Sequence, residues 1–280
     1  MQAMPSSIPP STLARLLLTD PEHADAGEAF YLLGRSSDAE LAERYQLVNV
    51  NTRDTDTSAS SSWDLVEEEE DFEEAPLPAL PRGCPAFGSC GKGLAVVFDT
   101  ETTALSPPIV CQLAWAVFSD GSLVGLHEYI LKLPAGATVS PQARAVHGLS
   151  TADCAKRGVD AAETFARFFL DVDRAMRSGG RVVAHNCGFD VRAITRTMEA
   201  WKLTPVGPFF EPGAVFCTMK NSKHRSHLLT KNGRQKAFSN SELYEYLTNK
   251  PPKWASLHNA LDDVLVTAHN YFGGIRVNLW

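Results

Sequence analysis

The stretch Leu94-Ala95-Val96-Val97-Phe98-Asp99-Thr100-Glu101 decides the fold prediction. Its five apolar residues in a row are typical of a strand that is buried on both faces. Asp99 and Glu101 come directly after this apolar run, and because side chains alternate along a strand, both point the same way. Neighbouring carboxylates repel each other, and a bound divalent cation removes that repulsion. The sequence therefore predicts a buried strand that ends on a candidate metal site.

The sequence after this strand predicts an α/β fold. The turn signal Asp120-Gly121 joins two apolar runs, which indicates a three-stranded meander together with residues 94–98. The expected strands are 109–118, 123–133, 182–184 and 215–218, and the expected helices are 159–176, 189–201 and 257–272. A meander followed by alternating helices and strands predicts a mixed sheet, with parallel strands beside the meander and helices on its faces.

Charge divides the 280 residues into two parts. Residues 1–92 contain 17 acidic and 6 basic residues, whereas residues 93–280 contain 16 and 20. We expect residues 1–50 to be an extension with short helical segments, and residues 51–92 to be an acidic, proline-rich linker. Such a composition buries too little apolar surface to fold, so this acidic N-terminal part is predicted to be largely disordered. Residues 93–280 are expected to form the globular domain.

The apolar runs and the cysteines suggest a location for the chain. No run approaches the ~20 residues of a membrane-spanning helix, and no secretory leader is expected. Six scattered cysteines suggest neither a disulfide framework nor a zinc site. We therefore expect an intracellular protein, cytoplasmic or nuclear, without a membrane partner.

Two further groups of polar residues stand where an expected strand ends or a helix begins. Asp190 falls in the first turn of the helix expected at 189–201, where helix-dipole stabilisation of ~0.3–1 kcal/mol would alone explain an acid. The run His258-Asn259-Ala260-Leu261-Asp262-Asp263 opens the last expected helix. Its spacing leaves both Asp262 and Asp263 as candidates for the site.

In this order, these motifs resemble those of the DEDDh exonucleases, the DnaQ-like branch of the ribonuclease H-like fold. Asp99-Thr100-Glu101 resembles the first family motif, D-x-E, and the run from His185 to Asp190 resembles the second, H-N-x-x-F-D. The run from His258 to Asp263 resembles the third, H-x-A-x-x-D, and this match selects Asp263. Val146-His147-Gly148 resembles a smaller V-H-G element. The resemblance covers residues 93–272, so the expected globular domain is a DEDDh exonuclease domain.

The resemblance implies a ribonuclease H-like mixed sheet and a metal-dependent 3′→5′ exonuclease. Such an enzyme releases nucleoside 5′-monophosphates from the 3′ end of single-stranded DNA or RNA. The implied catalytic residues are the general base His258 and the metal-binding acids Asp99, Glu101, Asp190 and Asp263. These acids would hold two Mg²⁺ ions, with Mn²⁺ able to substitute, because Mg²⁺ prefers oxygen ligands and a pair of ions can clamp both oxygens of an in-line displacement.

The resemblance also implies contacts to the terminal nucleotide of the substrate. The residues concerned are Thr102, Thr103, Leu105, His147, Asn186 and Phe189. One departure lies beside them, because Ala104 stands where the family usually has glycine. Alanine tolerates a positive φ poorly, so either this loop turns differently or the terminal nucleotide approaches it differently.

The segment between the second and third motifs is basic. Residues 220–253 contain eight Lys and Arg residues but only two acids, Glu242 and Glu245. We expect the run from Lys220 to Lys236 to be a loop that guides the phosphate backbone largely without base preference.

Two alternative functions remain open from the sequence. One is an exoribonuclease dedicated to trimming RNA 3′ ends, because no residue reveals how a 2′-hydroxyl is treated. The other is a non-catalytic nucleic-acid-binding module, against which the intact set of acids argues. A protein partner for the N-terminal extension is a further hypothesis, and the sequence leaves the oligomeric state open.

Overall fold

The computed structural model describes residues 80–87 and 91–280. The strands are β1 (Leu94–Thr102), β2 (Val110–Ser119), β3 (Ser122–Ile130), β4 (Arg181–Ala184) and β5 (Val215–Cys217). The α-helices are α4 (Pro141–His147), α5 (Thr151–Arg157), α6 (Ala161–Arg177), α7 (Cys187–Ala200), α8 (Thr218–Ser222), α9 (Asn240–Thr248) and α10 (Ala260–Arg276), and the 3₁₀ helices are η1 (Pro208–Phe210) and η2 (Lys223–Arg225). The expected extension, residues 1–50, and most of the expected linker lie outside the described residues.

The five strands form one mixed sheet in the order β3-β2-β1-β4-β5. β1, β2 and β3 form an antiparallel meander, and β4 and β5 are added parallel to β1 and to each other. The mixed sheet predicted from the sequence is therefore confirmed. β1 lies at its centre, between an antiparallel and a parallel neighbour, which explains the continuous apolar run at its start.

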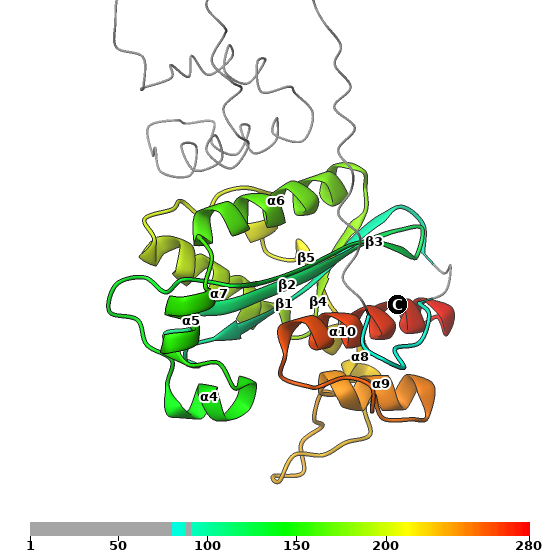
Figure 1. Ribbon diagram of the computed structural model, residues 1–280. Helices are drawn as coiled ribbons and strands as arrows, with labels where there is room; N and C mark the ends of the chain where they lie inside the picture. Colours follow the sequence, from blue (N-terminus) through cyan, green and yellow to red (C-terminus); the bar gives the residue numbers. More distant parts are fainter. Residues whose placement is uncertain (1–79, 88–90) are drawn as a thin grey trace, which may run out of the picture.

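Helices cover both faces of the sheet, with α6 and α7 on one side and α9 and α10 on the other (Figure 1). β1 supplies a core to each side. Val96 and Phe98 belong to the core that includes α6 and α7, whereas Ala95 and Val97 belong to the core that includes α10. No helix in the described part of the chain is both long and apolar enough to cross a bilayer.

Capping and turn residues account for several of the observed boundaries. The hairpin between β2 and β3 turns at Asp120 and Gly121, with φ of 50° and 80°, as a two-residue type I′ turn requires. α6 begins at Ala161 because the side chain of Asp160 accepts hydrogen bonds from the first turn. β1 runs past Phe98 to Thr102, since Asp99 and Glu101 still pair with β2. Both acids therefore lie within the strand and not after it.

The sequence did not predict four short helices, α4, α5, α8 and α9. Two of them begin with a capping box, Ser150 with Asp153 for α5 and Ser239 with Glu242 for α9. The four helices have only five to nine residues each, too few for a clear apolar periodicity. The basic run expected to be a loop from Lys220 to Lys236 instead begins within α8 and η2.

The segment just before β1 packs onto the domain. Phe87 is buried, its ring lies edge-on to Phe118 and it stacks on His269 with ring centroids 4.3 Å apart. Residues 80–87, which fall in the range expected to be linker, thus cover part of α10 (Figure 1).

The junction between α7 and β2 gives a stability prediction. The buried hydroxyl of Thr197 accepts a hydrogen bond from the backbone N–H of Val110 at 2.8 Å. Thr197→Val keeps the shape but leaves this buried N–H unpaired, so we expect it to lower the free energy of unfolding by about 1–3 kcal/mol. Chemical denaturation measures the change.

Thr195→Val is the matched control on the same helix. The Thr195 hydroxyl donates only to the carbonyl of Val191, one turn away, so its loss should change stability by less than about 0.5 kcal/mol. Equal effects of the two substitutions would show that the Val110 bond does not stabilise the fold.

Candidate active site

Three carboxylates meet at the end of β1. Asp99 and Glu101 project from the strand toward α10, and Asp263 lies in the first turn of that helix. One ligand oxygen from each of these residues lies within 4.8 Å of the others. The alternation along β1 explains the arrangement, because residues 95, 97, 99 and 101 share the face that α10 covers.

Asp190 approaches the same strand from the other side. It lies in the first turn of α7, is only 3% exposed, and accepts a hydrogen bond from the Thr100 hydroxyl at 2.7 Å. Thr100 stands between the two acids of β1 and faces α7. Asp190 is therefore held next to the cluster but is not part of the group of three closest carboxylates.

The four carboxylates act on one another electrostatically. Burial and the negative charges of Asp190, Asp263 and Glu101 raise the pKa of Asp99 well above its usual range. Burial, followed by the charges of Asp263 and Asp190, raises the pKa of Glu101 to about 8. Burial also raises the pKa of Asp190 to about 7 against the opposing Thr100 hydrogen bond, and it raises the pKa of Asp263. Four neighbouring carboxyl groups that resist ionisation are typical of a site that a cation completes.

The donor set fits a hard divalent cation. The three clustered residues offer only carboxylate oxygens, which suit Mg²⁺ and Mn²⁺ better than the softer metals that select sulfur or imidazole. Asp190 adds a fourth carboxylate from the opposite side of the strand. The structure places all four expected acids at the end of β1, and their binding of a metal stays a prediction.

His258 lies immediately before α10, beside Asp263. Its backbone has a φ of 68°, its side chain is exposed, and its N–H donates to the carboxylate of Asp263 at 2.7 Å. The helix itself starts at Ala260, since Asn259 caps it. His258 thus lies exposed beside the acid cluster. Its role as general base stays a prediction.

Several residues that the sequence motifs do not contain fix the start of α10. The Gln112 side chain accepts from the N–H of Ala260 at 3.4 Å and donates to Glu128 at 2.8 Å. Glu128 also accepts from the side chain of Asn259 at 3.2 Å. Polar residues on β2 and β3 therefore hold the segment that carries His258.

Asn240, the first residue of α9, holds Asp263 from the other direction. Its amide donates to the carbonyl of Asp263 at 3.0 Å and to the carboxylate at 3.3 Å. The amide of Asn270 and the hydroxyl of Thr267 in turn fix its oxygen. Nothing in the sequence pattern links Asn240 to Asp263, because 23 residues separate them.

Four of the six expected substrate contacts line one pocket beside the acids. This pocket, of about 220 Å³, is lined by Thr102, Leu105, His147 and Phe189 together with Glu101. Leu105 is 84% exposed and Phe189 is half-buried. Thr103 is buried and Asn186 is exposed, and neither lines the pocket.

Hydrogen bonds set the tautomer of His147. Its Nδ1 accepts from the N–H of Leu149 at 3.1 Å, so Nε2 carries the proton and donates to the carbonyl of Thr102, also at 3.1 Å. Burial lowers the pKa of His147, which keeps the ring neutral. The ring thereby ties α4 to the end of β1.

The loop after Thr103 turns without strain at Ala104. Ala104 is not among the described residues with positive φ, and its carbonyl accepts a hydrogen bond from the Thr102 hydroxyl at 3.0 Å. Whether this turn differs from the usual turn of the family stays a prediction. Alanine costs nothing here because the left-handed conformation that favours glycine is not used.

Comparison with protein families matches residues 96–271 to the family RNase_T, described as Exonuclease. A comparison with curated protein sequences finds no match. Among solved structures, cell-death related nuclease 4 (CRN-4) is similar, with 15% identity and a TM-score of 0.51. The similarity covers 68% of this chain and 66% of that one, and it supports the fold.

Two DNA-bound exonucleases give weaker structural similarities. Exonuclease X, in complex with 5′ overhanging duplex DNA, is 23% identical over 66% of this chain and 93% of its own, with a TM-score of 0.43. *E. coli* Exonuclease I, in complex with a dA16 oligonucleotide, is 14% identical over 63% of this chain, with a TM-score of 0.48. The match covers only 39% of Exonuclease I.

The raised pKa of Glu101 predicts how pH affects the metal-free protein. In the unfolded chain this carboxyl loses its proton near pH 4.5, but in the fold it keeps the proton to about pH 8. Stability should therefore fall as pH rises from 4.5 to 8, and Glu101→Gln should weaken that fall. Near pH 8, with a chelator present, we expect the variant to be more stable by about 1–3 kcal/mol in thermal unfolding.

Glu245→Gln is the control, because Glu245 is an exposed acid of α9 outside the cluster. It should leave the pH dependence unchanged, and saturating Mg²⁺ should stabilise the wild type more than Glu101→Gln. Identical pH profiles for the wild type and Glu101→Gln would contradict the repulsion argument.

Proposed function

Because this chain belongs to the RNase_T exonuclease family, we propose that it is a 3′→5′ exonuclease that releases nucleoside 5′-monophosphates from single-stranded nucleic acid. The observation that carries this proposal is the convergence of Asp99, Glu101 and Asp263 within 4.8 Å. Three carboxylates brought together by a buried strand and a helix 160 residues away have no structural need of one another, and their repulsion costs stability.

The metal-binding residues in this proposal are the four acids. Asp99, Glu101 and Asp263 supply the closest oxygens, and Asp190 binds from the α7 side. Two Mg²⁺ ions held there would stabilise the attacking and leaving oxygens of an in-line displacement at phosphorus. Thr100 and Asn240 hold Asp190 and Asp263 by hydrogen bonds, so these two carboxylates are oriented before any ligand binds.

His258 is the residue that we assign to proton transfer. A neutral imidazole can accept the proton of the attacking water, and His258 is exposed next to Asp263. The hydrogen bond from its backbone to Asp263 fixes the segment while leaving the ring free to face the substrate. The hydrogen bonds that link Gln112, Glu128 and Asn259 fix the segment that carries His258 to β2 and β3.

The pocket beside Glu101 is the proposed site for the terminal nucleoside. Its volume of about 220 Å³ and its lining by Leu105, Val146 and Phe189 suit one base and sugar placed next to the acids. A paired terminal base would have to separate from its partner before it entered so small a pocket. This geometry favours single-stranded or frayed ends, in either DNA or RNA.

His258→Ala should fold and bind Mn²⁺ like the wild type, but turnover should fall about 10²–10⁴-fold, as expected on loss of a general base. End-labelled DNA and RNA oligonucleotides incubated with Mg²⁺ give the rate, the polarity and the sugar preference in one product ladder. Asp99→Asn serves as the inactive reference.

His224→Ala is the matched control, since His224 is an exposed histidine of η2 that lines neither the nucleoside pocket nor the acid cluster. Its turnover should equal that of the wild type. Near-normal turnover of His258→Ala would remove the base assignment, and shortening of the oligonucleotide from its 5′ end would overturn the proposed polarity.

A further inference from the structure

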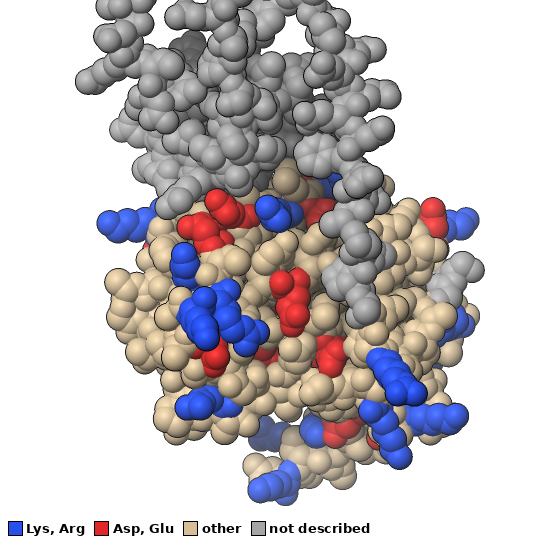
Figure 2. Space-filling view, viewed as in Figure 1, with Lys and Arg blue, Asp and Glu red and all other residues tan. Residues whose placement is uncertain are grey.

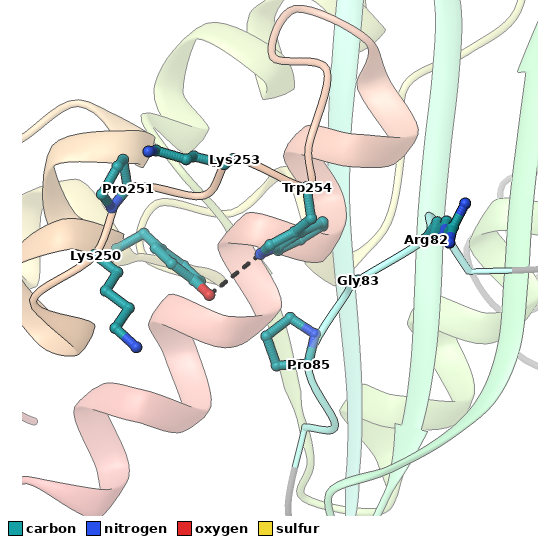
Figure 3. Close-up of a pocket in the computed structure, with 8 residues that line it drawn as sticks. Arg82, Gly83, Pro85, Lys250, Pro251, Lys253 and Trp254 are labelled. Carbon is teal, nitrogen blue, oxygen red and sulfur yellow. Dashed lines mark hydrogen bonds between the residues drawn. The ribbon is translucent and has the colours of Figure 1, made fainter.

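A second, larger cavity lies beside α9 and α10, and the acids do not line it. It has a volume of about 530 Å³ and opens between the segment before β1 and the segment that follows α9. Its lining residues are Arg82, Gly83, Pro85, Tyr244, Lys250, Pro251, Lys253 and Trp254. Lys250 and Lys253 lie on one side, Arg82 on the other, and Trp254 and Pro85 between them (Figure 3). We call this cavity the basic-aromatic pocket.

The charges of this pocket are all of one sign. Arg82, Lys250 and Lys253 are exposed, and none of them forms an ion pair with a residue that the structure describes. Within residues 80–87 and 91–280, no acidic residue lines the pocket. In Figure 2, Lys and Arg side chains gather at the lower right of the face, near the place where Figure 1 draws α9 and the segment before β1. The pocket is therefore suited to an anionic ligand.

Its aromatic residues are held in place. The Trp254 indole N–H donates to the Tyr244 hydroxyl at 3.2 Å, which fixes the edge of the indole. The Trp254 ring also packs against His269 of α10, with centroids 5.5 Å apart. Trp254 remains half-buried and is not sealed in the core. A positioned ring among cations that pair with no described residue is the combination that binds a base and its neighbouring phosphates.

The pocket is physically connected to the active site. Trp254 precedes His258 by four residues, a span of at most about 14 Å for an extended chain. Between them, the N–H of Ser256 donates to the carboxylate of Asp262 at 2.6 Å, in the same turn of α10 that carries Asp263. On the other wall, the thiol of Cys84 lies 3.7 Å from Nε2 of His269. The segment from Trp254 to His258 thus runs from the pocket to the start of α10, where Asp263 lies.

We propose that the basic-aromatic pocket binds an internal nucleotide of the single-stranded substrate, upstream of the 3′ end that occupies the acid cluster. This inference rests on the proposed exonuclease function and adds a second contact point to it. Trp254 stacks on a base, and Arg82, Lys250 and Lys253 contact the flanking phosphates. A strand that reaches both sites is held during removal of its last nucleotide, whereas a shorter strand loses this contact.

The lining favours nucleic acid over an acidic protein segment. Carboxylate side chains require only cations, and the stacking surface of Trp254 would then add nothing. Of the eight basic residues in 220–253, Lys250 and Lys253 alone line this pocket, while Lys236 pairs with Glu242 at 2.7 Å. Arg82, which lies far away in the sequence, lines the opposite side of the same pocket.

The test measures the affinity of oligothymidylates of increasing length by fluorescence anisotropy, using the full chain with Asp99→Asn to prevent hydrolysis. Added to this background, Lys250→Glu/Lys253→Glu should weaken binding of long oligonucleotides and leave that of the shortest ones unchanged. The slope of log affinity against log salt should fall by about 1.4, because each lost phosphate contact contributes about 0.7. Trp254→Leu should weaken binding of the long strands about 5- to 150-fold, the effect of losing one stacked base.

Arg181→Glu/Lys202→Glu is the matched control with the same change of charge. Arg181 is the first residue of β4 and pairs with Ala95, at the end of β1 away from the acids, and Lys202 follows the C-terminal end of α7. This pair should leave the affinity for long strands unchanged. The lysine variants also keep the test valid if Trp254→Leu does not fold, because both lysines are exposed.

Three outcomes would overturn the proposal: an equal loss in the control pair, an equal loss for short and long strands, or unchanged affinity in the lysine variant. The proposal would also be overturned if the protein bound an acidic peptide in place of the oligonucleotide and lost that binding on the lysine substitutions, because the pocket would then be a protein-docking site.

Hydrolysis by the chain without these substitutions is measured in parallel. A chain that hydrolyses DNA or RNA while the lysine variant binds normally keeps the proposed function and loses this inference. If the lysine variant loses binding of long strands only and the chain hydrolyses neither DNA nor RNA, this inference is kept and the proposed function is lost.

Discussion

The repulsion among carboxylates at the end of β1 is the constraint on which the rest of the site depends. A buried strand delivers Asp99 and Glu101 to one face, and α10 brings Asp263 to the same place. Burial and like charge raise the pKa of each, so the arrangement costs stability unless a cation is bound. Hydrogen bonds from Thr100 to Asp190 and from Asn240 to Asp263 orient these two carboxylates. They do not neutralise the negative charge of the acids.

The first turn of α10 organises both proposed sites. On one side Asp263 joins the acids and accepts the N–H of His258; on the other, Asp262 accepts the N–H of Ser256, in the segment that leads from Trp254. Gln112 and Glu128 fix the start of this helix to β2 and β3. The segment from Trp254 to His258 therefore connects the basic-aromatic pocket to the start of α10.

The sequence predicted the elements that have a clear periodicity or a motif. The apolar run 94–98, the Asp120-Gly121 turn and the long amphipathic α6 each carry a local signal, and the structure has all three. The acidic motifs also identified residues that meet in space, although Asp263 lies 162 positions after Glu101 and 164 after Asp99.

What the sequence did not reveal depends on packing between distant segments. Asn240 reaches Asp263 only because α9 packs on α10, and Gln112 reaches Ala260 only because β2 lies under that helix. The basic-aromatic pocket likewise joins Arg82 to Lys250 and Lys253 across 168 residues of sequence or more. The capping boxes of α5 and α9 were visible as Ser-x-x-Asp and Ser-x-x-Glu, but helices this short have too few residues to show a periodic face.

The most direct test of the central claim locates manganese by anomalous diffraction in crystals of the protein grown with Mn²⁺. We expect two anomalous peaks about 3.5–4 Å apart, coordinated by Asp99, Glu101, Asp190 and Asp263. Manganese bound at another place, or four carboxylates that bind no ion at saturating Mn²⁺, would contradict it.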